Sequence, residues 1–217
     1  PEQLLYSQMR LVNCKRVQGD FAGGEKIVLD LLKDKKAAES PNVQMAAANL
    51  YQSWAGSAEP DAWKKYLTAI QGMKTPVHLW GWAQIAQRLQ RTAYSKPDPK
   101  ITSLEYEARY NLGRCQLSLA KQQSVPAERE KTLSHAKLGV ETFARYSKAL
   151  PPEVIDRFTG LYNEIQKEGG ELPSELPVGI AAAVPPKPQV AGAPEANPVA
   201  AVTPAATPAH EETAQPQ

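Results

Sequence analysis

One ten-residue stretch near the middle of the chain constrains the fold more than any other. Residues 106–115 read Tyr-Glu-Ala-Arg-Tyr-Asn-Leu-Gly-Arg-Cys, and Ala108, Leu112 and Cys115 recur at the spacing of one helical face. Gly113 adds a position without a side chain, where a second helix can approach closely. A helix of this kind has to pack against two neighbours, which is typical of stacked helical hairpins.

Much of the remaining chain has the same helical period. Eight segments carry apolar residues three and four positions apart, and none shows the sustained alternation of a strand. These segments contain Leu5–Val12, Ile27–Leu32, Val43–Trp54, Trp63–Ile70, Trp82–Leu89, Leu104–Leu119, Leu133–Phe143 and Val154–Ile165. The pattern therefore predicts an all-α fold of about eight helices, each of about 12–20 residues.

Turn-forming residues separate these segments. Breaks are expected at Gly19-Asp20, Ser40-Pro41, Pro97-Asp98-Pro99, Pro126, Pro151-Pro152 and Gly169-Gly170. Pro60 and Pro76 are expected in the first turns of the helices that follow them. Thr102 and Glu105 have the spacing of a capping box, which predicts a helix start at Thr102.

The last part of the chain has a different composition. Residues 171–217 hold ten of the 19 prolines, together with twelve alanines and no aromatic residue. Such a stretch cannot bury enough apolar surface to offset the entropy of ordering it. We therefore expect one helical domain over residues 1–170 and a disordered Pro/Ala-rich tail over 171–217, in which Pro185–Pro188 belongs to an extended spacer.

Charge and motifs argue against several classes of function. Residues 1–170 carry a net charge of +6 and residues 171–217 a net charge of −4, without the basic run of a nucleic-acid-binding protein. No apolar run is long enough to span a membrane. His78, His135 and His210 are scattered, and no phosphate-binding loop or nucleophile motif occurs. We expect no nucleic acid, metal or cofactor, and no enzymatic activity.

The two cysteines and one tryptophan give further expectations. Cys14 and Cys115 lie in apolar helical stripes without a CxxC pair, which predicts buried reduced thiols rather than a zinc site or a disulfide. Trp80 lies two residues before Trp82 and so projects from a different side of a helix. We expect Trp80 to cover a seam between repeats in preference to forming an exposed anchor.

A weak internal repeat indicates a family. Leu11–Cys14 and Leu112–Cys115 share a Leu-x-x-Cys pattern 101 residues apart, close to three units of about 34 residues. With the turn at Gly19, the chain resembles the tetratricopeptide-repeat family, most clearly over 4–34 and 104–148. The resemblance implies a helical-hairpin solenoid with a right-handed superhelical twist, in which Gly24 and Gly113 allow close contacts. It leaves open which helices line the concave face.

The resemblance also implies a function. In this family, polar residues on the first helix of each hairpin face a groove that receives an extended peptide; here the matching positions are Arg10, Asn13, Asn49, Tyr110, Asn111 and Arg114. The residues four positions before the three asparagines are Met9, Met45 and Glu107, which does not fit the family's carboxylate clamp.

We therefore expect a non-catalytic scaffold that binds a protein or peptide partner. The alternative is a structural C-terminal segment of a longer repeat array, with no ligand of its own. An array segment should expose Leu4, Leu5 and Leu11, whereas a free-standing module should have a polar outer face on its first helix. The sequence identifies neither the partner nor the compartment.

Overall fold

The structure, a computed structural model, describes residues 2–147 and 149–179, and over them it contains nine α-helices. They are α1 (Glu2–Val17), α2 (Phe21–Leu31), α3 (Lys35–Ala38), α4 (Pro41–Ala55), α5 (Lys65–Gln71), α6 (Trp82–Ser95), α7 (Pro99–Gln122), α8 (Pro126–Tyr146) and α9 (Pro152–Glu168). The predicted all-α class is confirmed. The short helix α3 was not expected, so the sixth expected helix is α7. The solenoid arrangement stays a prediction.

The helices begin and end close to the expected breaks. The side chains of Asp20, Asp34 and Asp98 each accept a hydrogen bond from a backbone N–H in the first turn of the helix that follows. Prolines stand in the first turns of four helices, α4, α7, α8 and α9. Because these signals are local in sequence, they could be recognised without knowledge of the packing.

Two expectations about turns are wrong. Pro60 precedes a short 3-10 helix, η1 (Ala62–Lys64), without being part of it. Pro76 lies in the connection between β1 (Gly72–Met73) and β2 (Leu79–Trp80), which pair antiparallel with Gly72 opposite Trp80. With only two residues in each strand, this hairpin is too short to produce an alternating pattern.

The capping box at Thr102 is also wrong, because α7 begins three residues earlier. Asp98 caps the helix by accepting a hydrogen bond from the N–H of Lys100 at 2.8 Å. The Thr102 hydroxyl instead donates to the carbonyl of Asp98 at 3.0 Å, and Glu105 pairs with Arg109 at 2.8 Å. An aspartate followed by proline combines a side-chain cap with a pre-set φ angle, and here it defines the start.

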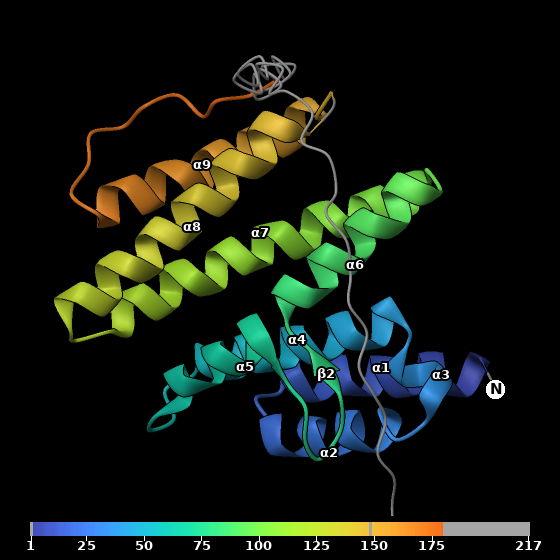
Figure 1. The fold of residues 1–217 in the computed structure, drawn as a ribbon. Coiled ribbons are helices and arrows are strands. Elements are labelled where there is room, and N and C mark those ends of the chain that lie inside the picture. The colour runs from blue at the N-terminus through green and yellow to red at the C-terminus, as the bar shows by residue number, and fades with distance from the viewer. Residues whose placement is uncertain (1, 148, 180–217) are drawn as a thin grey trace, which may run out of the picture. The chain divides into compact units, whose positions relative to one another are not determined.

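Most buried apolar side chains of the described residues belong to one of two hydrophobic clusters, and α7 contributes to both. The first cluster draws on α1 to α7 and includes Ala108, Cys115 and Leu119 of α7. The second draws on α7, α8, α9 and the residues that follow, and includes Leu117 and Ala120 of α7. Figure 1 shows α7 running between the helices that precede it and the pair α8–α9. This helix is therefore a wall shared by two cores.

Two glycines permit the closest helix contacts, as the sequence predicted. A Cβ atom on Gly113 would lie 2.9 Å from Cδ2 of Leu161 in α9 and 3.5 Å from Cγ2 of Val140 in α8. On Gly24 of α2 it would lie 2.8 Å from Cδ1 of Leu50 in α4. Since real Cβ atoms do not approach other carbons this closely, a side chain at either position forces its neighbour to move.

The two cysteines differ in burial, which corrects one expectation. Cys115 is fully buried, as expected, but Cys14 is exposed, and both thiols are free. The helix α1 packs against α2 and α4 through the face that contains Val12. Leu11 and Cys14 lie on another face, where Leu11 is 47% exposed. The Leu-x-x-Cys repeat thus describes two helices with different numbers of neighbours.

Trp80 is buried and not an exposed anchor, but it lies in β2 and not on a helix as expected, and a glutamine binds its backbone. Only 5% of its surface is exposed, and the guanidinium of Arg88 lies 4.0 Å from the centre of a Trp80 ring. The backbone N–H of Trp80 donates to Oε1 of the fully buried Gln44 at 2.7 Å. Nε2 of Gln44 donates to the backbone carbonyls of Ala38 and His78. The amide of Gln44 thereby attaches β2 to α4.

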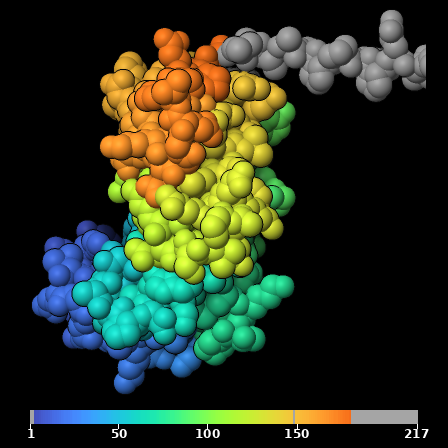
Figure 2. Space-filling view, turned by 90° about the vertical axis from the view of Figure 1, so that its left-hand side faces the viewer, coloured from blue at the N-terminus to red at the C-terminus, as the bar shows by residue number. Residues whose placement is uncertain are grey.

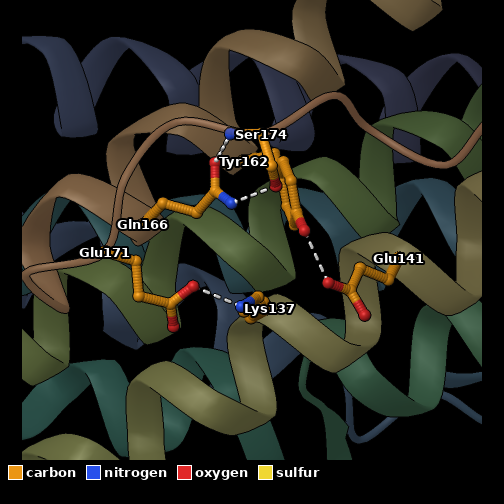
Figure 3. A network of polar contacts seen from close by, with 6 residues as sticks. All are labelled: Lys137, Glu141, Tyr162, Gln166, Glu171 and Ser174. Atoms are coloured by element: carbon orange, nitrogen blue, oxygen red, sulfur yellow. Dashed lines mark hydrogen bonds and ion pairs between the residues drawn. The ribbon is translucent and has the colours of Figure 1, made fainter.

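The boundary of the expected tail is misplaced. Residues 171–179, called the 171–179 segment below, have no regular secondary structure but lie on α8 and α9, with Leu176 only 7% exposed. Figure 3 shows Ser174 of this segment next to Gln166 and Tyr162 of α9. The Pro/Ala-rich average over 171–217 concealed the apolar residues at its start. Residues 180–217, including Pro185–Pro188, lie outside the described residues.

The close contact at Gly113 can be tested by substitution. We expect Gly113→Val to lower the free energy of unfolding by about 1–3 kcal/mol, because the added methyl groups overpack the contact with Leu161. Gly139→Val in α8 is the matched control, since a Cβ at that position would have nothing within 4 Å apart from its chain neighbours and the backbone of its own helix. Urea titration of both variants measures the difference. Equal stability of the two variants would contradict a close contact at Gly113.

Candidate functional site

A groove of about 310 Å³ lies between α1, α4 and α7. Three of the six predicted binding residues line it, namely Arg10 and Asn13 of α1 and Asn49 of α4. The other lining residues are Tyr6, Met9, Val12, Arg16, Asn42, Met45, Ala46 and Leu104. Residues from three separate parts of the chain thus meet at one surface.

The floor of the groove is apolar. Val12 and Met45 are 1% and 8% exposed, and Met9 and Leu104 are partly buried against the first core. Methionine side chains are unbranched and adapt to different shapes. The floor can therefore adapt to apolar side chains of different shapes.

The rim of the groove presents hydrogen-bond donors. Nε and Nη2 of Arg16 both donate to Oδ1 of Asn13, at 3.0 and 2.7 Å, and Nη1 donates to Oγ of Ser53 at 3.1 Å. Since arginine can only donate, the atom of Asn13 that faces it is the oxygen, which leaves the amide N–H groups for a ligand. Arg10 lies over the ring of Tyr6 at 5.7 Å. None of the described lining residues is acidic.

The other three predicted residues, Tyr110, Asn111 and Arg114, do not line this groove. All three lie on α7 and contact other helices. Tyr110 packs edge-on against Phe158 of α9, with ring centres 5.8 Å apart. Arg114 pairs with Glu164 of α9 at 2.9 Å. The structure therefore divides the predicted site into a groove on α1 and α4 and a set of contacts between α7 and its neighbours.

Asn111 is the centre of a hydrogen-bonded chain across three helices. Trp82 of α6 donates to Oε1 of Gln52 in α4 at 2.8 Å, and Nε2 of Gln52 donates to Oδ1 of Asn111 at 3.3 Å. Asn111 in turn donates to Glu107 at 2.7 Å. With 6% of its surface exposed, Asn111 has both ends of its amide bonded within the protein. It therefore positions helices and has little capacity left for a ligand.

Glu107 extends this chain to α9. Arg157 donates to its Oε2 at 2.6 Å, and the Arg157 guanidinium lies 3.7 Å from the centre of the Tyr110 ring. Partial burial raises the pKa of Glu107, but the hydrogen bonds from Arg157 and Asn111 and the positive charge of Arg157 outweigh it, so the pKa lies below its usual value of 4.5. The ionised carboxylate is thus the form that the fold stabilises.

Sequence reasoning missed several groove residues, of which Tyr6 and Arg16 are the clearest. They lie four residues before Arg10 and three residues after Asn13, so they share the same side of α1. The helical period alone could have found them. Met45 carried no such signal, because a buried methionine in an apolar stripe is usually a core residue.

Of the two free thiols, that of Cys115 is the buried one. Burial raises the pKa of the Cys115 thiol despite the nearby charge of Arg114, so this cysteine is a poor nucleophile. Among residues 2–147 and 149–179, no three His, Cys, Asp or Glu residues gather in a group that could hold a metal ion. Within the same ranges no helix has the length and apolarity needed to cross a bilayer.

Comparison with models of protein families, with curated proteins and with solved structures found no match to this chain. The proposals below therefore depend on the geometry of the described residues.

The hydrogen bonds to Glu107 predict a pH dependence of stability. Because its pKa is lower in the folded than in the unfolded protein, Glu107 contributes stability above pH 4.5, and this contribution is lost as the pH falls through the folded pKa. We expect Glu107→Gln to show a smaller loss of stability than the unsubstituted protein between about pH 5 and pH 3. Thermal unfolding over this range measures it. Identical pH profiles would refute the role of the Glu107 carboxylate.

Proposed function

We propose that this protein is a non-catalytic interaction module that binds an extended peptide in the groove between α1, α4 and α7. The observation that carries the proposal is the combination of an apolar floor with a rim of donors, contributed by helices that are far apart in sequence. Peptide sites commonly combine an apolar pocket for an anchoring side chain with a few polar groups that fix orientation.

The chemistry of the rim favours an acceptor-rich ligand. Arg10 and Arg16 bring positive charge, and the amide N–H groups of Asn13 are suited to the carbonyl groups of an extended backbone. An acidic residue next to an apolar anchor would satisfy both rim and floor. The proposed partner is therefore a peptide segment in which an apolar side chain has an aspartate or glutamate beside it.

The family resemblance is consistent with this proposal without adding proof. Arg10, Asn13 and Asn49 were expected to face a peptide because of their positions in the first helices of hairpins, and all three line the groove. Membership of the tetratricopeptide-repeat family and the solenoid arrangement remain predictions. The proposal itself needs only the groove.

Selection from a displayed library of random peptides tests the groove. We expect the full chain to select peptides with an acidic residue beside an apolar one. Arg10→Glu should weaken the selected peptides by about tenfold or more through charge reversal, and Asn49→Ala by a smaller factor. Fluorescence anisotropy with one labelled peptide measures both affinities.

A matched control separates local from general charge effects. Arg145→Glu makes the same change of charge at an exposed position on α8 that does not line the groove, and it should leave the affinity unchanged. Binding should also weaken as the salt concentration rises. If Arg10→Glu and Arg145→Glu have equal effects, the groove is not the binding site.

The exposed face of α1 supports a second candidate function, a structural segment of a longer repeat array. Leu4 and Leu11 are 65% and 47% exposed, as expected for this alternative, although Leu5 is partly buried. A neighbouring helical hairpin of the same array would cover these leucines, because stacked repeats bury their apolar faces against one another. In this role the chain has no ligand of its own.

Self-association provides the test of this candidate. The exposed leucines should make the chain associate in a concentration-dependent manner, and Leu4→Lys combined with Leu11→Lys should abolish the association. Leu138→Lys is the control, since Leu138 is 60% exposed on α8. Sedimentation velocity over a range of concentrations measures it. A chain that stays monomeric throughout would count against an unpaired stacking face.

A further inference from the structure

The 171–179 segment is held on α8 and α9 as an extended peptide. Gln166 of α9 is 2% exposed, and both ends of its amide bond the same residue of the segment. Its Nε2 donates to Oγ of Ser174 at 2.6 Å, and its Oε1 accepts from the N–H of Ser174 at 3.1 Å (Figure 3). A side-chain amide that pairs with a backbone N–H recognises the main chain of an extended segment.

Three further contacts position the segment. Lys137 of α8 forms an ion pair with Glu171 at one end, and the carbonyl of Ala144 accepts from the N–H of Gly179 at the other. Between them Leu176 packs into the second core, with Val178 partly buried beside it. The surface thus contacts a carboxylate, a hydroxyl-bearing residue three positions after the carboxylate and a leucine five positions after it.

One hydrogen bond beneath the segment joins α8 and α9 directly. Tyr162 of α9 is 3% exposed and donates its hydroxyl to Glu141 of α8 at 2.6 Å (Figure 3). This bond joins the two helices without using the segment. The surface formed by α8 and α9 therefore has contacts of its own that do not involve the segment.

The segment is attached in a way that permits release. It contains no helix or strand. Gly170, just before the segment, and Gly179, its last residue, have φ angles of +72° and +62°, which favour glycine. In Figure 2 the orange part of the chain, which comprises α9 and the residues that follow it, lies on the face shown. Leu172 of the segment is 88% exposed. Removing the segment therefore need not unfold α8 or α9.

From these contacts we propose that the surface formed by α8 and α9 is a second peptide-binding site, which the 171–179 segment occupies in cis. Its partner is an extended segment of another protein with the same spacing of acidic residue, serine or threonine, and leucine. The partner binds when the chain's own segment is displaced. This site shares no lining residue with the groove between α1, α4 and α7, so the two proposals stand independently.

Competition between the two segments determines the affinity that is observed. A tethered segment acts at an effective concentration on the order of millimolar, so it strongly suppresses binding of the same sequence supplied as a free peptide. Loss of the tethered segment's contacts should remove this suppression. Release of the segment is then the step that exposes the site.

The test uses the full chain and a labelled peptide with the sequence of residues 170–179. Leu176→Asp should release the segment, because it places a charge at a buried position. Ser174→Pro should also release it, since proline provides neither the N–H nor the hydroxyl that bond Gln166, and Ser174 lies outside the helices. We expect both variants to bind the peptide at least about tenfold more tightly than the unsubstituted chain, by fluorescence anisotropy.

Two controls make the result specific. Leu172→Asp introduces the same charge into the same segment at an exposed leucine, and it should not increase binding. A peptide with aspartate in place of its second leucine, the equivalent of Leu176, should not bind the released variants. Circular dichroism shows whether each variant keeps its helices, and Ser174→Pro carries the test if Leu176→Asp unfolds. The proposal is overturned if the folded releasing variants bind no better than Leu172→Asp, or if both peptides bind equally.

Discussion

The structure depends on a single helix that has to be buried on two sides. Helix α7 gives Ala108, Cys115 and Leu119 to one core and Leu117 and Ala120 to the other, so small and apolar residues occupy two of its sides. Gly113 then allows α9 to approach to within van der Waals contact. Because interiors are close-packed, this requirement also determines where α4, α6, α8 and α9 can lie. Leu104, near the start of the same helix, completes the lining of the groove between α1 and α4.

Glutamine side chains connect separate parts of the structure at three places. Gln44 holds the backbone of β2, and Gln166 holds that of the 171–179 segment, in each case by pairing Oε1 with a backbone N–H. The partly buried Gln52 connects Trp82 to Asn111 through side-chain hydrogen bonds. A side-chain amide has both donors and an acceptor. One glutamine can therefore form hydrogen bonds with backbone groups that have no neighbouring strand to bond with. The fold thus already contains the type of contact that both proposed peptide sites require.

Much of the helical pattern could be predicted from the sequence, since periodicity and end signals such as Asp20 and Pro126 act over a few residues. Burial that depends on distant neighbours could not. Cys14 and Cys115 occupy equivalent positions in a repeated pattern, yet only α7 has helices on both sides. For the candidate site, the positions expected on α1 and α4 line the groove, whereas Asn111 of α7 joins helices through Gln52 and Glu107.

Native-state hydrogen exchange as a function of denaturant tests most directly whether α7 unites the two cores. Leu50 in α4 and Leu161 in α9 are both almost fully buried, one in each core, and α7 lies against both groups of helices. If the cores share one wall, their most protected amides exchange through the same global opening and converge on a single free energy. If amides around Leu161 exchange through a smaller opening while those around Leu50 stay protected, the two cores are independent and the account is contradicted.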